Sequence, residues 1–216
     1  MAEDEGNRSP MPLPNHLVAF VKAPRLGRVK SRLARDIGTV AAWQFYRTTL
    51  RSVLRQLDGG GRWFRWIAVT PDPATAETSL WPCGWRPIPQ GHGDLGTRMA
   101  RVMRTLPPGP VLIVGTDVPG IRSRHIAAAF RTLGSHQAVF GPADDGGYWL
   151  VGLRRRPRCP GIFAPRIFAE VRWSTPAALA DTLAGLPVGD VAMLERLQDI
   201  DTGADLDRWR RSRHGL

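Results

Sequence analysis

The sequence is poor in cysteine and histidine, and it has no long apolar run. Its two cysteines, Cys83 and Cys159, are too few for a disulfide framework or a zinc site with four ligands. Of the five histidines, only His92 lies beside a glycine-rich loop, and the others show no metal-ligand spacing. No apolar run approaches the roughly 20 residues that cross a bilayer. A disulfide scaffold, a zinc module and a membrane-spanning protein are therefore poor explanations of this chain.

The first fifteen residues, MAEDEGNRSPMPLPN, lack the apolar core of a signal peptide. They are acidic and contain proline, so we expect a disordered tail over residues 1–15 and a cytoplasmic protein. The remaining sequence has no internal repeat and no linker long enough to divide it. Because 216 residues can bury one substantial core, we expect a single domain over residues 16–212. The sequence leaves the oligomeric state open.

Positive charge is what the sequence has in excess, with 30 Lys and Arg against 19 Asp and Glu and a formal net charge of +11. Clustered cations favour nucleic acid, because they neutralise phosphates and release counterions. A small phosphorylated substrate is a second explanation, and an arginine-rich composition throughout the chain is a third. Arginine does occur along the whole chain, so local clusters have to be judged by their position.

Strand and helix signals alternate along the chain. Apolar runs that end in turn residues predict five strands, at residues 16–21, 63–70, 111–117, 137–144 and 148–153. Helical spacing predicts five helices: one with Thr39 as its N-cap, one that carries Leu95 and Met99, one with Ser123 as its N-cap, one opened by Thr175–Pro176, and one that follows a capping box at Thr202. This order predicts an α/β fold with a mostly parallel sheet covered on both faces. In such sheets ligands bind outside the carboxyl ends of the strands.

A basic loop directly follows the first predicted strand. Six cations lie in this loop and the residues after it: Lys22, Arg25, Arg28, Lys30, Arg32 and Arg35. Guanidinium groups bind phosphate oxygens bidentately and lysine supplies a compact charge. A helix that begins near Val29 would place Arg28, Arg32 and Arg35 on one face and turn Lys30 elsewhere. A solvated helix face is the alternative, but the position at the end of a strand favours phosphate binding.

Three carboxylates are candidates for metal binding. Asp117 is the last residue of the predicted strand 111–117, where it would hold a divalent cation together with substrate phosphates, or cap a turn. Asp205 has a structural role as the acidic partner of a capping box with Thr202. Capping therefore leaves Asp199 and Asp201 unexplained, and either is a candidate second metal ligand.

Two glycine-containing segments are candidate substrate loops. In GDLGTRM (93–99), Gly93 and Gly96 would allow the backbone to approach a ligand, and Asp94 would otherwise serve as the N-cap of the next helix. The second segment reads either as a turn between paired strands or as a loop that lines a site. It consists of Asp144, Asp145, Gly146 and Gly147.

Five motifs in a fixed order resemble those of the radical-SAM/selenodomain-associated transferase 1 family: FVKAPRLGRVKSRLA, GDLGTRM, VLIVGTDVP, GPADDGGYWLVGL and DIDTGADL. The resemblance covers about residues 16–210. It implies a three-layer nucleotide-diphospho-sugar transferase fold of the GT-A, Rossmann-like type.

Two more distant resemblances suggest roles for single residues. KAPRLGRVKSRLA is similar to the substrate loop of 2-phospholactate guanylyltransferases, and the ending Asp-Thr-x-x-Asp-Leu is similar to that of CMP-sugar synthetases. These similarities imply that Asp117 and Asp201 hold Mg²⁺ or Mn²⁺. They also imply a set of phosphate-binding cations, namely Lys22, Arg25, Lys30 and Arg32.

These expectations combine into a metal-dependent transferase that acts on a nucleotide-activated donor and a small-molecule acceptor, with Asp144 or Asp145 near the acceptor. Glycosyl transfer from a nucleoside diphosphate sugar (an NDP-sugar) is the leading interpretation. Nucleotidyl transfer from a nucleoside triphosphate is the alternative, because so many cations suit a triphosphate. A nucleic-acid-binding protein and a non-catalytic nucleotide-binding relative are alternatives from other classes. The aromatic residues lie mainly within strand and helix patterns rather than between basic residues, which speaks against nucleic acid.

Overall fold

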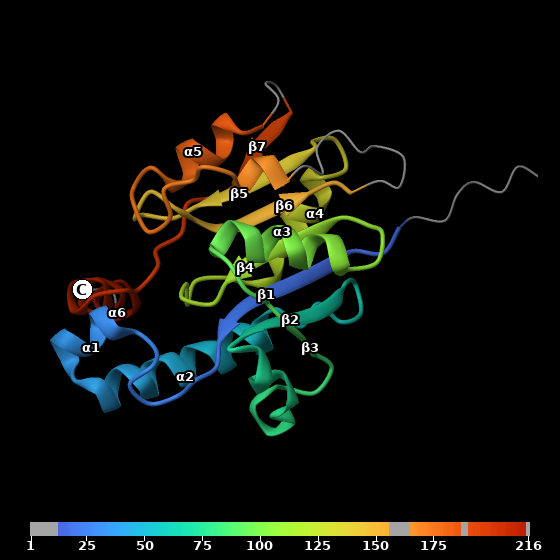
Figure 1. Ribbon diagram of the computed structural model, residues 1–216. Coiled ribbons are helices and arrows are strands. Elements are labelled where there is room, and N and C mark those ends of the chain that lie inside the picture. The colour runs from blue at the N-terminus through green and yellow to red at the C-terminus, as the bar shows by residue number, and fades with distance from the viewer. Residues whose placement is uncertain (1–12, 156–164, 187–189, 215–216) are drawn as a thin grey trace, which may run out of the picture.

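The computed structural model describes residues 13–155, 165–186 and 190–214. Its centre is a seven-stranded sheet in the order β3-β2-β1-β4-β6-β5-β7 (Figure 1). The strands are β1 (His16–Lys22), β2 (Phe64–Thr70), β3 (Arg86–Pro89), β4 (Val111–Gly115), β5 (Ala138–Pro142), β6 (Tyr148–Leu153) and β7 (Val191–Met193). Strands β1 to β4 run parallel and β5 is parallel to β7, whereas β6 is antiparallel to both β4 and β5. The predicted α/β fold with a mostly parallel sheet is confirmed.

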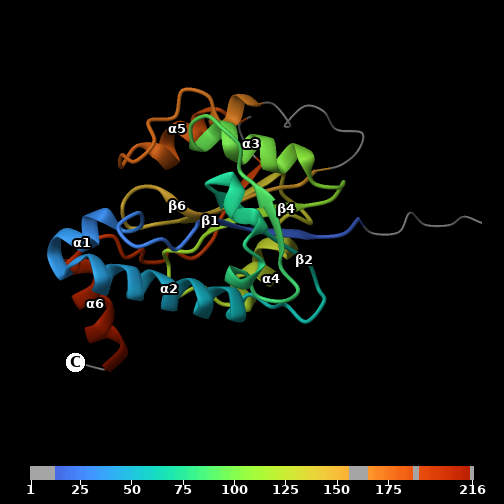
Figure 2. The same cartoon turned by 60° about the horizontal axis from the view of Figure 1, so that its bottom comes forward.

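Helices cover both faces of the sheet. They are α1 (Ser31–Ile37), α2 (Thr39–Gln56), α3 (Leu95–Thr105), α4 (Ser123–Thr132), α5 (Ala178–Ala184) and α6 (Gly203–His214). Figure 2 shows α3 and α5 on one face of the sheet and α2 and α4 on the other. The result is the three-layer arrangement that the sequence predicts.

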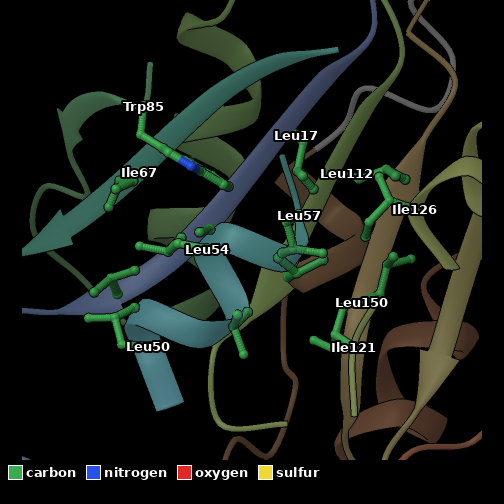
Figure 3. Packing of buried hydrophobic residues seen from close by; sticks show 14 of the residues in the cluster. Leu17, Leu50, Leu54, Leu57, Ile67, Trp85, Leu112, Ile121, Ile126 and Leu150 are labelled. Carbon is green, nitrogen blue, oxygen red and sulfur yellow. The ribbon is translucent and has the colours of Figure 1, made fainter. Parts of the chain in front are cut away.

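The side chains of β1 alternate between two cores, as the period of a strand requires. Leu17, Ala19 and Val21 are fully buried on the face covered by α2 and α4, whereas Val18 is buried on the face covered by α3. Figure 3 shows part of the first core, where Leu57, the C-cap of α2, lies close to Leu17 of the sheet, and Leu50 and Leu54 of α2 belong to the same cluster. The continuous apolar run at 16–21 is thus explained by burial on both faces.

A small third cluster lies beside the sheet. Leu33 of α1 and Ala42 of α2 pack there against Ile200 and Leu206 from the C-terminal part of the chain. Figures 1 and 2 both show α1 and α6 side by side. This packing holds the segment around Ile200 against the helix that follows the basic loop.

Several predicted element boundaries are wrong. Thr39 and Ser123 are the first residues of their helices, and Gly38 and Arg122 occupy the N-cap positions. The helix predicted from Thr175–Pro176 begins at Ala178, because the Thr175 hydroxyl accepts a hydrogen bond from Ala177 N in a turn before it. Edge strands β3 and β7 were not predicted, since they are short and β3 contains two prolines.

Other expectations are met or lie outside the described residues. Gly185 ends α5, and the Thr202–Asp205 capping box forms, with Asp205 Oδ2 accepting from Thr202 N at 2.9 Å. Most of the predicted N-terminal tail, residues 1–12, lies outside the described residues. In the part of the chain that the structure describes, no helix is both long and apolar enough to span a bilayer.

Candidate active site

The three segments that the sequence places at strand ends meet at one edge of the sheet. β1 and β4 are parallel neighbours, so the loops after Lys22 and Gly115 leave the sheet side by side. Because β6 is antiparallel to β4, the turn at residues 143–147 that connects β5 to β6 lies at the same edge. This edge is where open α/β sheets bind ligands.

The segment that carries Asp199 and Asp201 reaches this edge through backbone hydrogen bonds. Leu194 N donates to Phe140 O at 2.8 Å and Leu197 N donates to Pro142 O at 3.1 Å, so the chain follows the end of β5. Ile200 N then donates to Asp117 O at 3.1 Å. These contacts place the candidate carboxylates of the C-terminal segment beside the end of β4.

Lys30 lies between the two proposed metal ligands. Its Nζ donates to Asp201 Oδ1 at 2.7 Å and to Ile200 O at 2.6 Å, and it lies 3.2 Å from Asp117 Oδ2. The Lys30 side chain is only 4% exposed. Burial alone would lower the pKa of Lys30, but the two neighbouring carboxylates outweigh it and raise the pKa.

The sequence predicted a helix from near Val29 with Lys30 turned away from the arginines, and of these only the helix start is wrong. Helix α1 begins at Ser31 rather than near Val29, and Lys30 precedes it with φ 50° and ψ 48°, in the left-handed region. Its side chain is buried, and its Nζ group lies between the two carboxylates. Arg32 is exposed, and its Nη1 lies 3.5 Å from Asp201 Oδ2.

Asp117 and Asp201 form a donor set that suits a divalent cation. Both carboxylates approach the same ammonium group, and Asp117 Oδ1 is buried without a hydrogen-bond partner among the described residues. Burial raises the pKa of Asp117, and the positive charge of Lys30 opposes that rise. No cluster of three or more His, Cys, Asp or Glu side chains suited to a metal occurs in the described ranges. A cation here would need ligands from a substrate, as Mg²⁺ beside phosphates has.

A cavity of about 310 Å³ opens next to these carboxylates. Asp117, Asp145, Asp199 and Asp201 line its polar side. Burial, followed by the charge of Asp145, raises the pKa of Asp199 to about 6. Four carboxyl groups therefore surround the same space.

Aromatic side chains also line the cavity. Tyr148 and Trp173 line it and meet edge to face, with ring centroids 6.4 Å apart. Trp173 Nε1 is buried and has no hydrogen-bond partner among the residues described. An aromatic wall with an unused N–H donor suits a ligand with hydroxyl groups and an apolar face. No sequence motif marked Trp173, because it lies on a segment without regular structure.

Hydrogen bonds connect the start of the basic loop to helix α2. Tyr46 Oη donates to Lys22 O at 2.7 Å and accepts from Lys22 N at 3.1 Å, while Trp43 Nε1 donates to Pro24 O at 2.7 Å. Lys22 and Arg28 are exposed and form no ion pair with any residue that the structure describes. Arg25 pairs with Glu77 at 2.5 Å, away from the two carboxylates. The loop thus has one buried cation at the carboxylates and several exposed ones around it.

The glycine-containing segments have mainly structural contacts. Asp94 is exposed and is the N-cap of α3, since its Oδ1 accepts from Thr97 N at 2.7 Å, and Gly93 has a positive φ of 107°. Gly96 faces protein rather than a ligand, because a Cβ there would lie 2.7 Å from Phe168 Cβ and 2.8 Å from the Trp173 ring. The structure does not bring Gly93 and Asp94 into the cavity lining.

The segment at residues 144–147 is a turn between paired strands, and part of it also lines the cavity. It joins the antiparallel strands β5 and β6, and it contributes Asp145 and Gly147 to the cavity. Asp145 Oδ1 accepts from Gly147 N at 2.8 Å. Gly146 has a φ of 85°, and a Cβ there would overlap the backbone of Pro176, so glycine lets the turn meet that segment. Asp144 is exposed and is not part of the cavity lining.

Comparisons with known proteins agree with this architecture. Residues 53–175 match a protein family described as "Uncharacterized protein conserved in bacteria (DUF2064)". A search of curated proteins gave no match. A solved structure of a candidate nucleotide-diphospho-sugar transferase from Desulfovibrio desulfuricans G20 is similar to the chain. Its TM-score is 0.77 with 26% identity, and the match covers 92% of this chain and 87% of that one.

More distant structures have the same fold. A 4-diphosphocytidyl-2C-methyl-D-erythritol synthase from Anaerococcus prevotii DSM 20548 has a TM-score of 0.59 at 11% identity, over 93% of this chain and 99% of that one. A glucosyl-3-phosphoglycerate synthase from Mycobacterium tuberculosis, solved with Mn²⁺, UDP and phosphoglyceric acid, has a TM-score of 0.50 at 10% identity. That match covers 90% of this chain and 73% of that one. The nucleotide-diphospho-sugar transferase fold is confirmed, and the narrower resemblance to the selenodomain-associated transferases stays a prediction.

Proposed function

The chain belongs to the DUF2064 family, and we propose that it is a metal-dependent transferase acting on a nucleotide-activated donor. The observation that carries the proposal is the convergence of Asp117 and Asp201 on one point at the carboxyl ends of β1 and β4. Two carboxylates at such an edge, next to exposed cations, suit a donor that carries phosphates and a divalent cation. The likeness to the Desulfovibrio protein supports the same class of reaction.

Asp117 and Asp201 would hold Mg²⁺ or Mn²⁺, and the distant M. tuberculosis synthase, a structure with Mn²⁺ and UDP, supports this choice of metal. When bound, the ion would neutralise negative charge on the phosphates of the leaving group. Arg32 lies 3.5 Å from Asp201, and the exposed Lys22 and Arg28 belong to the same part of the chain, so these three cations would bind the same phosphates. Arg25 would reach them only by leaving Glu77.

The cavity beside the carboxylates would receive the group that is transferred and its acceptor. Tyr148 and Trp173 would pack against the apolar face of a sugar, and Trp173 Nε1 would donate to a hydroxyl. Asp145 lines the same cavity and would accept the proton of the acceptor hydroxyl. Asp144 is exposed and would act at the entrance. Gly93 and Asp94 would contribute by fixing the start of α3.

We favour glycosyl transfer from an NDP-sugar to a small acceptor, because the aromatic wall suits a sugar. Nucleotidyl transfer, in which a phosphate attacks a nucleoside triphosphate and pyrophosphate leaves, is the second candidate. The number of cations near the carboxylates favours it, and so does a likeness to a CMP:2-keto-3-deoxy-manno-octonic acid synthetase solved with CTP (TM-score 0.55, 13% identity). A non-catalytic nucleotide-binding protein is less well supported, because the two carboxylates converge.

One experiment separates these reactions. The protein is incubated with Mg²⁺ or Mn²⁺ and with panels of nucleoside triphosphates and NDP-sugars, and thermal stabilisation and released products are measured. Release of a nucleoside diphosphate supports glycosyl transfer, and release of pyrophosphate supports nucleotidyl transfer. If neither panel stabilises the protein in the presence of metal, the transferase proposal is wrong. Salt-sensitive binding to DNA or RNA without any such stabilisation would favour the nucleic-acid alternative.

A further inference from the structure

Lysine is rare in this chain, and its placement is informative. Of the 30 basic residues only two are lysines, Lys22 and Lys30, and both lie in or beside the basic loop. Everywhere else the chain uses arginine. The buried position between Asp117 and Asp201 is thus filled by the cation that the chain otherwise avoids.

The contacts of Lys30 explain why arginine would not serve there. An ammonium group has three protons on one small atom, whereas a guanidinium group is planar and presents its donors as a fork. Lys30 Nζ has three oxygen neighbours, Ile200 O at 2.6 Å, Asp201 Oδ1 at 2.7 Å and Asp117 Oδ2 at 3.2 Å. The group therefore acts as a compact cation surrounded by oxygen atoms, which is also how a small metal ion is bound.

The backbone at Lys30 supports a specific role. Lys30 has a φ of 50°, in a backbone region that residues other than Gly, Asn and Asp seldom adopt. Such conformations persist where the surroundings hold them in place. Here the Nζ group is held by Ile200 O and Asp201, and the Lys30 carbonyl accepts from Ala34 N at 2.8 Å at the start of α1.

Building on the proposed function, we infer that Lys30 is an internal counter-ion that occupies the cation site while no donor is bound. A divalent cation that arrives with the donor's phosphates takes over Asp117 and Asp201, and the Lys30 ammonium group then pairs with phosphate. The lysine side chain has a flexible stem of four carbons. Rotation about its bonds lets Nζ change its partner without movement of the sheet. Lys30 is in this view a positioning residue that couples metal binding to donor binding.

The balance of charge gives the reason for the coupling. Asp117, Asp201 and the Lys30 ammonium group together carry one negative charge. A divalent cation without phosphates would lie beside the buried Lys30 ammonium group, and the two like charges would repel each other. A diphosphate removes this conflict, because its oxygens bind both the cation and the lysine. Metal and diphosphate therefore bind cooperatively, and each increases the affinity for the other by the same factor.

Binding of Mn²⁺ to the purified protein tests the inference directly. Free Mn²⁺ is measured by electron paramagnetic resonance, with and without pyrophosphate as the phosphate probe, after correction for the Mn²⁺–pyrophosphate complex. We expect Lys30→Met to bind Mn²⁺ alone more tightly than the wild type, by about tenfold or more. Arg35→Met is the control. It removes one exposed charge from helix α1, away from the carboxylates, and it should leave the affinity for Mn²⁺ unchanged. The double variant with Asp117→Asn should lose the added affinity.

The outcomes separate this inference from the proposed function. Equal or weaker binding of Mn²⁺ by Lys30→Met, while the wild type binds Mn²⁺ with pyrophosphate, would overturn only the role of Lys30. If no form binds Mn²⁺ with or without pyrophosphate, the metal site of the proposed function is wrong and the inference is rejected with it. Both measurements can be interpreted without knowledge of the donor's base and sugar or of the acceptor.

A second measurement uses the wild type and does not depend on the folding of a variant. Because the chain has two lysines, protein labelled with ¹³C-lysine gives two side-chain Cε signals in an NMR spectrum. We expect the Lys30 signal to shift far more with Mg²⁺ and pyrophosphate together than with Mg²⁺ alone. An unchanged Lys30 signal at saturating Mg²⁺ and pyrophosphate would overturn the inference.

Discussion

The Lys30 ammonium group and the Asp201 carboxylate are 2.7 Å apart, although 171 positions separate them in the sequence. The contact joins the loop after the first strand to the segment before the last helix. Helix α1 packs against α6, and Leu33 packs against Ile200, so the two segments that form this contact are held together. Formation of the site thus requires the C-terminal segment to dock, so the candidate active site and the completed fold depend on each other.

We predict that Asp117→Asn will lower kcat by a factor of about 10² to 10³ once a donor is identified, since it removes one charge from the carboxylate pair. The variant should also lose the thermal stabilisation that metal and pyrophosphate give to the wild type. Asp207→Asn changes an exposed aspartate on α6, and it serves as the control for loss of a negative charge. A metal-dependent stabilisation that survives in Asp117→Asn would contradict the metal role of Asp117.

We predict that Trp173→Phe will weaken binding of the transferred sugar or the acceptor and leave kcat largely unchanged. Phenylalanine keeps an aromatic ring in the cavity wall but removes the indole N–H, which has no partner among the described residues. Loss of one hydrogen bond to an uncharged hydroxyl corresponds to about 0.5–1.5 kcal/mol, so KM should rise by about two- to tenfold. Steady-state kinetics with the substrate identified by the donor panel measure both constants. A fall in kcat at constant KM would place Trp173 outside the binding step.

The sequence predicts the sheet well, because the strands at its centre are buried on both faces and appear as continuous apolar runs. The edge strands β3 and β7 carry no such signal. Their positions follow from pairing with β2 and β5, which is a long-range property of the fold. Helix starts were missed where a residue with no capping side chain, such as Gly38, occupies the N-cap position.

For the site, position along the chain indicates which residues lie at the ligand-binding edge but not which way they face. Asp117 was selected because it follows a strand, and it does lie at that edge. Lys30 has a left-handed backbone and a buried side chain, and no local pattern in the sequence indicates either. Trp173 was missed for a different reason, since its place in the cavity wall depends on the packing of Phe168 and Gly96 around it.

We predict that Tyr46→Phe will lower the free energy of unfolding by about 1–3 kcal/mol. The Tyr46 hydroxyl both donates to Lys22 O and accepts from Lys22 N, so its removal leaves two backbone groups at the end of β1 without that partner. Tyr148→Phe is a matched control, because among the described residues the Tyr148 hydroxyl has one long contact, 3.4 Å from Thr182 Oγ1, and a smaller loss is expected. Urea denaturation measures both. Equal losses would show that the contacts with Lys22 are not what stabilises this end of β1.

We predict that the protein loses stability as the pH falls below about 6.5, in part through His16. His16 is buried at the start of β1, where its Nδ1 accepts from Trp66 Nε1 at 3.2 Å. Burial lowers the pKa of His16, and Arg155 lowers it further. A lowered folded-state pKa means that the stabilisation is complete above the unfolded value and is lost as the pH falls through the folded value.

Unfolding free energies measured between pH 8 and pH 5 check this prediction. His16→Gln cannot titrate, so its stability should depend less on pH over this interval, whatever its absolute value. Some dependence should remain, because burial also lowers the pKa of His125, whereas the pKa of Asp199 is raised to about 6 and acts on stability in the opposite direction. An identical dependence on pH in the wild type and His16→Gln would contradict the assignment to His16.

We predict that Gly96→Ala destabilises the protein, although the same change in an exposed helix stabilises by about 0.5–1 kcal/mol. Gly96 lies in the first turn of α3, and an added Cβ would lie 2.7 Å from Phe168 Cβ and 2.8 Å from the Trp173 ring. Overpacking of this kind costs about 1–3 kcal/mol, which exceeds the gain in helix propensity. Gly120→Ala is the control, because nothing lies within 4 Å of its added Cβ. Since the clash would displace Trp173, Gly96→Ala should also raise KM as Trp173→Phe does. A variant as stable as the wild type, with an unchanged KM, would show that the contacts around Gly96 do not hold the aromatic wall of the cavity.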